Sequence, residues 1–366
     1  MRIGDRAIGS GEPAFIIAEI GVNHNGNART AVDMVRVAAE AGADAVKLQT
    51  FRAEALVTAD APKAQYQRRE TGAGTQGQML RTLELDEAGH RAVLHACREH
   101  RVVFLSTPFD ESSADMLVSL GVPAIKIGSG DITHTPLIEH CARTGLPLII
   151  STGMSDTDEV ARAVEAARAA GCADVALLHC VSSYPAPPDQ ANLRAISAMR
   201  DRFGVPVGWS DHSEIQPNPA LTAVAAVALG AGIFERHFTL DRALPGPDHA
   251  ASLEPGELAG YVAAIRRTEA ALGDGAKRCM PCEADTRQVA RRSLVARRDI
   301  EAGEVITAEM LDARRPGTGI APTHTDKIVG RVARDRIEAG TLVQLDHARE
   351  RVGLSADTPD TRHATA

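Results

Sequence analysis

Two histidines at the ends of apolar segments are the first candidates for chemistry in this sequence. His212 and His237 each end such a segment and lie close to a carboxylate, Asp211 and Glu235 respectively. A single buried histidine is usually structural, but two at matching positions could hold one divalent ion, with water in the open positions. Neutral imidazoles suit Mn²⁺, Co²⁺ or Zn²⁺ better than Ca²⁺. The pair therefore predicts a metal site, and Asp248 is a further polar candidate beside it.

Two lysines inside apolar segments, Lys47 and Lys126, form a second constellation. Burying an ammonium is costly unless it meets an anion. Polar residues that end the same or similar segments could add donors: Gln49, Thr107, Ser129, Ser151 and Ser210. Two lysines with a ring of hydroxyls favour a pocket for a phosphate and a carboxylate. The alternative is a lysine that forms an imine with a carbonyl substrate, although one lysine would then suffice and the histidine pair would have no use.

Glu19 ends the apolar segment 15–19 and is followed by a Gly- and Asn-rich stretch. A carboxylate at this position could transfer protons at a reacting hydroxyl or carbonyl group. The alternative interpretation is that Glu19 only pairs with a buried lysine.

These candidates belong to a repeated pattern of strands and helices. Eight short segments are rich in Val, Ile and Leu without alternation, as expected of strands buried on both faces. They are 15–19, 43–49, 102–107, 124–129, 147–152, 175–179, 206–212 and 232–237. Helices are expected between them, for example at 30–41, 86–100, 157–170 and 219–229, where acidic caps or terminal glycines mark the ends. The pattern predicts an α/β fold, a TIM (β/α)8 barrel, in which all carboxyl ends of strands open onto one face.

One connection is much longer than the others. Residues 51–78 follow the second expected strand, are polar, and contain Lys63, Arg68 and Arg69 with three glycines. Loops of this length are uncommon unless they form lids or binding segments. We expect a lid, with a mere surface excursion as the alternative.

The barrel pattern covers residues 1–272 and then changes. Residues 273–292 are polar and are predicted to be a linker. Residues 293–349 contain short β-like segments in which Ile-Glu-Ala-Gly at 300–303 recurs at 337–340, which suggests a small domain with pseudo-twofold symmetry. Residues 350–366 have almost no apolar content and are expected to be a disordered tail.

Composition limits the function classes. The 366 residues carry a net charge of −8, so no basic surface is expected for nucleic acid or an anionic membrane. No apolar stretch reaches the roughly 20 residues of a membrane helix, and residues 1–13 do not resemble a signal peptide, so we expect a cytoplasmic protein. The six cysteines follow no disulfide framework. Cys279 and Cys282 form one C-x-x-C pair, which we interpret as part of the linker, with zinc or redox work as the alternative.

Taken in order, the motifs resemble those of the sialic acid synthase family. They are Phe-Ile-Ile-Ala-Glu at 15–19, Val-Lys-Leu-Gln at 46–49, Leu-Ser-Thr-Pro at 105–108, Lys-Ile-Gly-Ser-Gly-Asp at 126–131, Ser-Thr-Gly-Met at 151–154, Ser-Ser-Tyr-Pro at 182–185, Trp-Ser-Asp-His at 209–212, Glu-Arg-His at 235–237 and Arg-Pro-Gly-Thr-Gly at 315–319. The resemblance covers residues 13–348. It implies a TIM barrel with a C-terminal antifreeze-like (SAF, β-clip) domain, and an enzyme that condenses phosphoenolpyruvate with a six-carbon acylaminosugar.

The resemblance also implies residue roles. His212 and His237 would hold Mn²⁺ or Mg²⁺. The phosphoenolpyruvate site would consist of Lys47, Thr107, Lys126, Ser129, Ser151, Ser182 and Ser210. Gln49, Asp131 and Tyr184 would face the sugar, while Glu19 and Asp248 would be catalytic. Arg315 would reach the sugar from the partner subunit of a homodimer whose C-terminal domain is swapped over the neighbouring barrel.

Departures from the family pattern leave the sugar open. Ser182 lies where N-acetylneuraminate enzymes tend to have Asn, and Asp131 lies where many have Glu. The stretches 61–67, 246–249 and 252–255 look more like legionaminic acid synthases, so the acceptor is either N-acetylmannosamine or 2,4-diacetamido-2,4,6-trideoxy-mannose, with a slight preference for the second. Two other classes remain as alternatives: an imine-forming aldolase on the same barrel, and a non-catalytic carbohydrate-binding protein.

Overall fold

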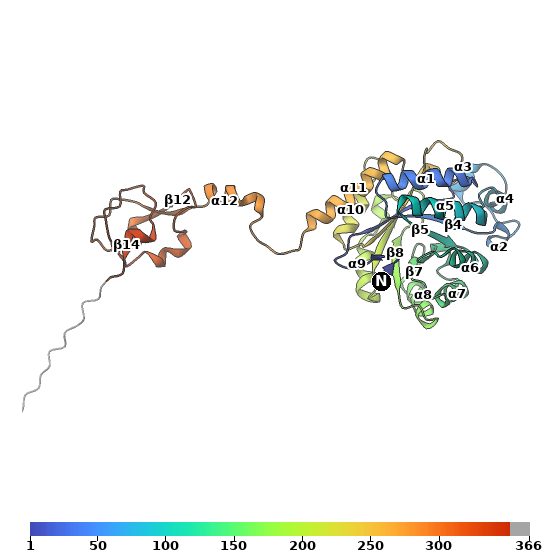
Figure 1. The fold of residues 1–366 in the computed structure, drawn as a ribbon, viewed down its shortest axis with the longest axis horizontal. Helices are drawn as coiled ribbons and strands as arrows, with labels where there is room; N and C mark the ends of the chain where they lie inside the picture. Colours follow the sequence, from blue (N-terminus) through green and yellow to red (C-terminus); the bar gives the residue numbers. More distant parts are fainter. Residues whose placement is uncertain (352–366) are drawn as a thin grey trace, which may run out of the picture. The chain divides into compact units, whose positions relative to one another are not determined.

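The computed structural model describes residues 1–351 and divides the chain into two compact units (Figure 1). The larger unit is Met1–Asp274, and the smaller unit begins at Gly275. Most of the predicted tail, residues 352–366, lies outside the described residues. Within residues 1–351, no helix has both the length and the apolar character needed to cross a membrane.

Eight parallel strands form the centre of the larger unit, one in each predicted segment. They are β3 (Phe15–Gly21), β4 (Ala45–Thr50), β5 (Val103–Pro108), β6 (Ile125–Ile127), β7 (Leu148–Ser151), β8 (Val175–Cys180), β9 (Val207–Asp211) and β10 (Ile233–His237). Their order is β5-β4-β3-β10-β9-β8-β7-β6, and β5 lies beside β6, so the sheet closes on itself. The predicted TIM-barrel fold is confirmed.

Helices surround this barrel (Figure 1). They are α1 (Ala28–Glu40), α5 (Glu87–His100), α6 (Glu111–Leu120), α7 (Thr135–Arg143), α8 (Thr157–Ala169), α9 (Arg194–Phe203), α10 (Leu221–Ala228) and α11 (Pro255–Leu272). The caps are those expected from the sequence. Asp86 accepts a hydrogen bond from the Gly89 amide, and Asp156 accepts from the amides of Asp158 and Glu159.

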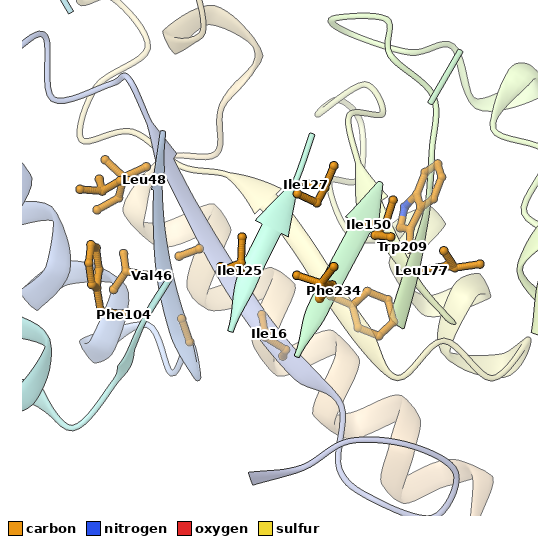
Figure 2. Packing of buried hydrophobic residues seen from close by; sticks show 14 of the residues in the cluster. Ile16, Val46, Leu48, Phe104, Ile125, Ile127, Ile150, Leu177, Trp209 and Phe234 are labelled. Carbon is orange, nitrogen blue, oxygen red and sulfur yellow. The ribbon is translucent and has the colours of Figure 1, made fainter. Parts of the chain in front are cut away.

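The strands divide their side chains between two cores with a period of two residues. One core lies between the strands and the helices and contains Ile16, Val46, Phe104, Ile125, Ile150, Leu177, Trp209 and Phe234 (Figure 2). The other is the barrel interior, made of Phe15, Ile17, Ala45, Leu105, Ala124, Ile149, Leu178 and Ile233. Ile3, at the end of β1 (Arg2–Ile3), and Ile8, which follows β2 (Arg6–Ala7), join this interior core. Residues two positions further along each strand therefore also face the interior.

The predicted lid is not a structureless loop. It contains α2 (Ala53–Leu56), α3 (Gln65–Thr71) and α4 (Gln76–Arg81). Thr75 and Gln78 cap the start of α4 reciprocally. Phe51 and Ala53 of the segment pack into a small core with Val22 and with the following residues Met79, Leu80 and Leu83. This small core explains why a mostly polar segment is folded.

The smaller unit contains α12 (Ala284–Ala290), which lies in the predicted linker, followed by β11 (Ser293–Ala296), β12 (Leu311–Arg314), β13 (Val332–Ala333) and β14 (Ala348–Arg349). The echoed segments pair with each other, since Ile300 and Ile337 exchange two hydrogen bonds of 2.9 Å. The Gly303 amide donates to the Ala333 carbonyl at 2.9 Å, and the Gly340 amide donates to the Ala296 carbonyl at 2.8 Å. These matching pairs agree with the predicted pseudo-twofold symmetry.

A buried ion pair outside the barrel gives a stability prediction. Arg236 and Asp211 lie 2.8 Å apart, and their side chains are 1% and 0% exposed. Replacing Arg236 by Met leaves the carboxylate of Asp211 without its cation, so the free energy of unfolding should fall by roughly 3–5 kcal/mol. Urea unfolding measures this change. Arg202→Met is the matched control, because Arg202 forms an exposed pair with Asp158 at 3.4 Å, and its loss should cost at most about 1 kcal/mol. Equal effects of the two substitutions would contradict this prediction.

Candidate functional site

Four buried charged residues meet inside the barrel at the carboxyl ends of its strands. The Lys47 Nζ lies 2.7 Å from the Glu19 Oε2 and 3.8 Å from the Glu235 Oε2. The Lys126 Nζ lies 3.6 Å from the Glu235 Oε1. Each of the four residues is at most 5% exposed. The quartet is neutral as a whole, which lowers the cost of burying it.

The environment of the quartet shifts its pKa values in different directions. Burial raises the pKa of Glu19 to about 7, although Lys47 opposes this shift. The pKa of Lys47 is raised, because Glu19 and Glu235 together outweigh the effect of burial. The pKa of Lys126 is lowered by burial, which Glu235 only partly offsets. The pKa of Glu235 is lowered, because the two lysines outweigh burial. Of the two carboxyl groups in the quartet, Glu19 is therefore the one whose pKa lies near neutrality.

Hydroxyl groups form hydrogen bonds with two members of the quartet. The Lys47 Nζ donates to the Thr107 Oγ1 at 2.8 Å, and the Ser210 Oγ donates to the Glu235 Oε1 at 3.3 Å. The Ser151 Oγ is buried without a hydrogen-bond partner among the described residues. Burying an unpaired hydroxyl costs free energy unless a ligand forms a hydrogen bond with it.

The backbone at Gly153 packs closely against two of the predicted hydroxyl groups. Its amide donates to the Ser129 Oγ at 3.0 Å. A Cβ atom on Gly153 would overlap the Ser182 hydroxyl and would lie 2.8 Å from the Ser129 Oγ. Only glycine therefore lets these two hydroxyls approach the same point. The predicted residues Ser129 and Ser182 are thus brought together.

The two predicted metal ligands lie next to each other. The ring centroids of His212 and His237 are 5.3 Å apart, and the ring of Tyr184 lies 4.3 Å from that of His212 and 5.8 Å from that of His237. The His212 Nδ1 is 3.1 Å from the Val181 carbonyl oxygen, which can only accept, so Nδ1 carries a proton and Nε2 is free to bind a ligand when the ring is neutral. The His237 Nδ1 is buried and has no hydrogen-bond partner within residues 1–351.

These histidines fit a catalytic ion better than a structural one. The pKa of His237 is well below its usual value, mainly because of burial and of His212, which favours the neutral ring that a metal requires. The pKa of His212 is raised, since Cys180 and the Val181 carbonyl outweigh burial, so ion binding there would release a proton. Within residues 1–351 there is no cluster of three or more His, Cys, Asp or Glu side chains that could hold a metal ion. The chain would thus supply two ligands and leave the other positions open.

A small cavity of about 90 Å³ adjoins His237. Its polar walls include Gln49, Tyr184 and Asp248, which the sequence predicted, and its other walls come from the lid segment and from Val22 and Pro247. Burial raises the pKa of Asp248 to about 6. Ligand pockets commonly enclose about 300–1,000 Å³. The cavity is thus suited to one end of a ligand.

The predicted residues Asp131 and Arg315 each follow a strand. Asp131 is in the turn after β6, and its Oδ2 is buried without a hydrogen-bond partner within residues 1–351. Arg315 follows β12 in the smaller unit and is exposed.

The sequence reasoning missed or misjudged some residues. Glu235 contacts both lysines, and its place two residues before His237 is the signal that could have identified it as inward-facing. Asp211, the carboxylate that immediately precedes His212, faces outward to Arg236. Cys180 was not considered; its Sγ lies 3.6 Å from the His212 Nδ1. Tyr66 and Gln67 of α3 also line the small cavity.

Comparison with known proteins places this site in a family. A family model described as the NeuB family matches residues 34–277, and a model of the SAF domain matches residues 291–349. The chain belongs to the NeuB family. The resemblance found in the motifs, including the C-terminal SAF domain, is thereby confirmed.

Curated relatives span nearly the whole NeuB chain. It is 44% identical to the N,N'-diacetyllegionaminic acid synthase of Legionella pneumophila, over 94% of this chain and 97% of that one. It is 39% identical to the synthase of the same name from Campylobacter jejuni, over 90% and 98% of the two chains. It is 37% identical to the N-acetylneuraminate-9-phosphate synthase of the mouse, over 84% and 85%.

Solved structures agree with this placement. The N-acetylneuraminic acid (sialic acid) synthetase of Leptospira borgpetersenii, crystallised with citrate, is 33% identical, with a TM-score of 0.68, over 78% of this NeuB chain and 94% of that one. The spore coat polysaccharide biosynthesis protein of Bacillus subtilis is 35% identical, with a TM-score of 0.64, over 96% and 99%. A 3-deoxy-D-arabino-heptulosonate 7-phosphate synthase of Thermotoga maritima, 15% identical with a TM-score of 0.58, shares the fold.

Asp131 gives a pH prediction. Burial raises its pKa from 3.8 to about 6. Between these values the folded state keeps a proton that the unfolded state has lost, so stability falls as the pH rises from about 4 to about 6 and this penalty is constant above that range. Asp131→Asn should remove the penalty, so the variant should unfold at higher urea than the parent at pH 7.5 and at nearly the same urea at pH 4. A stability difference that does not change with pH would contradict the assignment.

Proposed function

We propose that this protein condenses phosphoenolpyruvate with the open-chain aldehyde of an acylaminosugar, giving a nonulosonic acid and phosphate. The observation that carries the proposal is the pair of buried lysines next to a pair of buried histidines at the carboxyl mouth of the barrel. Membership of the NeuB family and the names of its relatives support the reaction class.

The lysines and hydroxyls form the site for phosphoenolpyruvate in this proposal. Lys126 has weak contacts of its own, because its ion pair is 3.6 Å long and its hydrogen bond to the Ile127 carbonyl is 3.4 Å long. An incoming phosphate or carboxylate would give this ammonium a closer partner. Lys47, Thr107, Ser129, Ser151, Ser182 and Ser210 would supply the remaining donors.

The reaction follows from the placement of charge. C3 of phosphoenolpyruvate attacks the aldehyde carbon, water adds to the resulting cationic C2, and phosphate leaves with cleavage of its C–O bond. Glu19 and Asp248 would exchange protons with the alkoxide and the attacking water, while Gln49, Asp131 and Tyr184 would orient the sugar. A divalent ion, Mn²⁺ or Mg²⁺, held by His212 and His237 would polarise the aldehyde oxygen as a Lewis acid when bound.

The imine-forming aldolase remains the second candidate because of one observation: the lowered pKa of Lys126 favours its neutral, nucleophilic form. Against it, Lys47 is paired with Glu19 at 2.7 Å and is held protonated. Inactivation by borohydride only in the presence of a 2-keto acid substrate, the component on which the lysine imine forms, would support the aldolase. A non-catalytic binding module has no need of the buried quartet.

The acceptor, the assembly and the location are finer proposals. We prefer 2,4-diacetamido-2,4,6-trideoxy-mannose to N-acetylmannosamine, which agrees with the names of the Legionella and Campylobacter relatives. We further propose a homodimer in which Arg315 reaches the sugar of the neighbouring barrel, and a cytoplasmic location. We also propose the domain limits predicted from the sequence: a barrel at 1–272, a linker at 273–292, a SAF domain at 293–349 and a tail at 350–366.

A phosphate-release assay tests the reaction. Phosphoenolpyruvate, Mn²⁺ and either acylaminosugar should give phosphate and a nine-carbon acid, and neither substrate should give phosphate alone. Excess chelator should abolish turnover, and Mn²⁺ should restore it. His237→Ala should weaken Mn²⁺ binding, measured by calorimetry, because one of two protein ligands is lost. Full turnover in chelator with no metal in the purified protein would refute the metal site.

Mixed dimers test the swap. Arg315→Ala and Glu19→Gln should each be inactive as homodimers. After co-refolding, about half of the dimers should be mixed, and each mixed dimer should have one complete site, so about a quarter of all sites should recover activity. Absence of recovery, with subunit mixing confirmed by mass spectrometry, would show that Arg315 acts in its own chain or not at the site.

A further inference from the structure

Lys63 is a buried lysine outside the quartet whose partners are unusual. It is 7% exposed. Its Nζ donates to the Thr71 Oγ1 at 2.9 Å and to the carbonyl oxygens of Thr71, Gly72 and Ala73 at 3.3, 3.2 and 3.1 Å. Within residues 1–351 it has no carboxylate partner. An ammonium has three protons, so the segment 71–73 uses its whole donor capacity.

These bonds connect the segment that precedes α3 with the residues at the carboxyl end of the helix. Lys63 precedes the helix, and the oxygens that it binds belong to the residues that end it. A helix of seven residues is not stable by itself in water. Gly72 has a φ of 70°, a conformation that favours glycine and that turns its carbonyl toward the ammonium. The bonds of Lys63 therefore stabilise α3, whose own hydrogen bonds are too few to keep it folded.

The helix held in this way faces the candidate site. Tyr66 stacks on Tyr184, with ring centroids 5.2 Å apart and an angle of 26° between the planes. Gln67 is buried, and its Oε1 accepts a hydrogen bond from the Ala64 amide at 3.0 Å. Both side chains line the small cavity together with His237 and Asp248. A phenol and an amide are suitable partners for the hydroxyl and acylamino groups of a sugar.

We propose that Lys63 is a positioning residue for the acceptor sugar, which it serves by fixing α3 so that Tyr66 and Gln67 form one wall of the acceptor site. This inference rests on the proposed function. A displacement of about 1 Å in such a wall is enough to reduce catalysis strongly. Lys63 acts at a distance from the phosphoenolpyruvate donors, so its loss should affect one substrate only.

The test compares three substitutions of a cation by methionine. Lys63→Met should raise the KM for the acylaminosugar about tenfold or more, the factor that corresponds to about 1.4 kcal/mol, and should change the KM for phosphoenolpyruvate by less than about twofold. Lys126→Met should show the opposite pattern. Arg68→Met is the matched control, because Arg68 lies on the same helix with an exposed side chain, and it should change neither KM.

Limited trypsin digestion reports on α3 without using activity. Arg68 and Arg69 are cleavage sites on the helix itself. Lys63→Met should increase cleavage after these residues, identified by mass spectrometry, while sites in the barrel helices stay protected because only the local segment opens. The acylaminosugar should slow this cleavage in the parent protein.

Each outcome decides the inference. Faster cleavage of α3 with an unchanged KM for the sugar would show that Lys63 holds the helix but that the helix is not part of the acceptor site. Unchanged cleavage would refute the positioning role. If the parent protein releases no phosphate with any acylaminosugar, the proposed function fails, while the digestion still tests whether Lys63 holds α3.

Discussion

The buried quartet of Glu19, Lys47, Lys126 and Glu235 is the constraint on which the rest of the site depends. Two ammonium groups inside a barrel would be unstable alone, and two carboxylates would be unstable without them. Their mutual neutralisation lets four charges occupy the mouth of an otherwise apolar core. The long pairs to Glu235, at 3.6 and 3.8 Å, leave the lysines free to improve their contacts with an anion.

The site and the core are built by the same alternation. Ile17, Ala45, Ala124 and Ile233 fill the barrel interior, and the residue two positions after each is a member of the quartet. The intervening residues face the helices, where Asp211 and Arg236 form a separate ion pair. The strands thus present apolar side chains to the closed interior and ionised groups to its mouth, so a stable core positions the chemistry directly.

The lid adds a wall that the barrel lacks. Its short helices are held by a small apolar core and by the bonds of Lys63 rather than by their own length. Such a segment can differ between relatives without disturbing the barrel, because its contacts are mainly local. It is therefore a suitable place for selectivity toward the acceptor, whereas in the proposed function the lysines and hydroxyls of the barrel would bind phosphoenolpyruvate.

Local pattern was enough to determine much of this protein. The eight strand segments, the helices with their caps, the echo in the smaller unit, and the candidate residues Glu19, Lys47, Lys126, His212 and His237 all follow from short-range preferences and from the hydrophobic period, which need no long-range information. Only the tertiary structure decided which of the two carboxylates close to the histidines in sequence faces the interior and contacts the lysines, Glu235 rather than Asp211, because a shift of one residue in register moves every side chain to the other face. It also decided that Lys63 binds three carbonyl oxygens at residues 71–73 and that Tyr66 stacks on Tyr184, since neither contact follows from the helical or strand period.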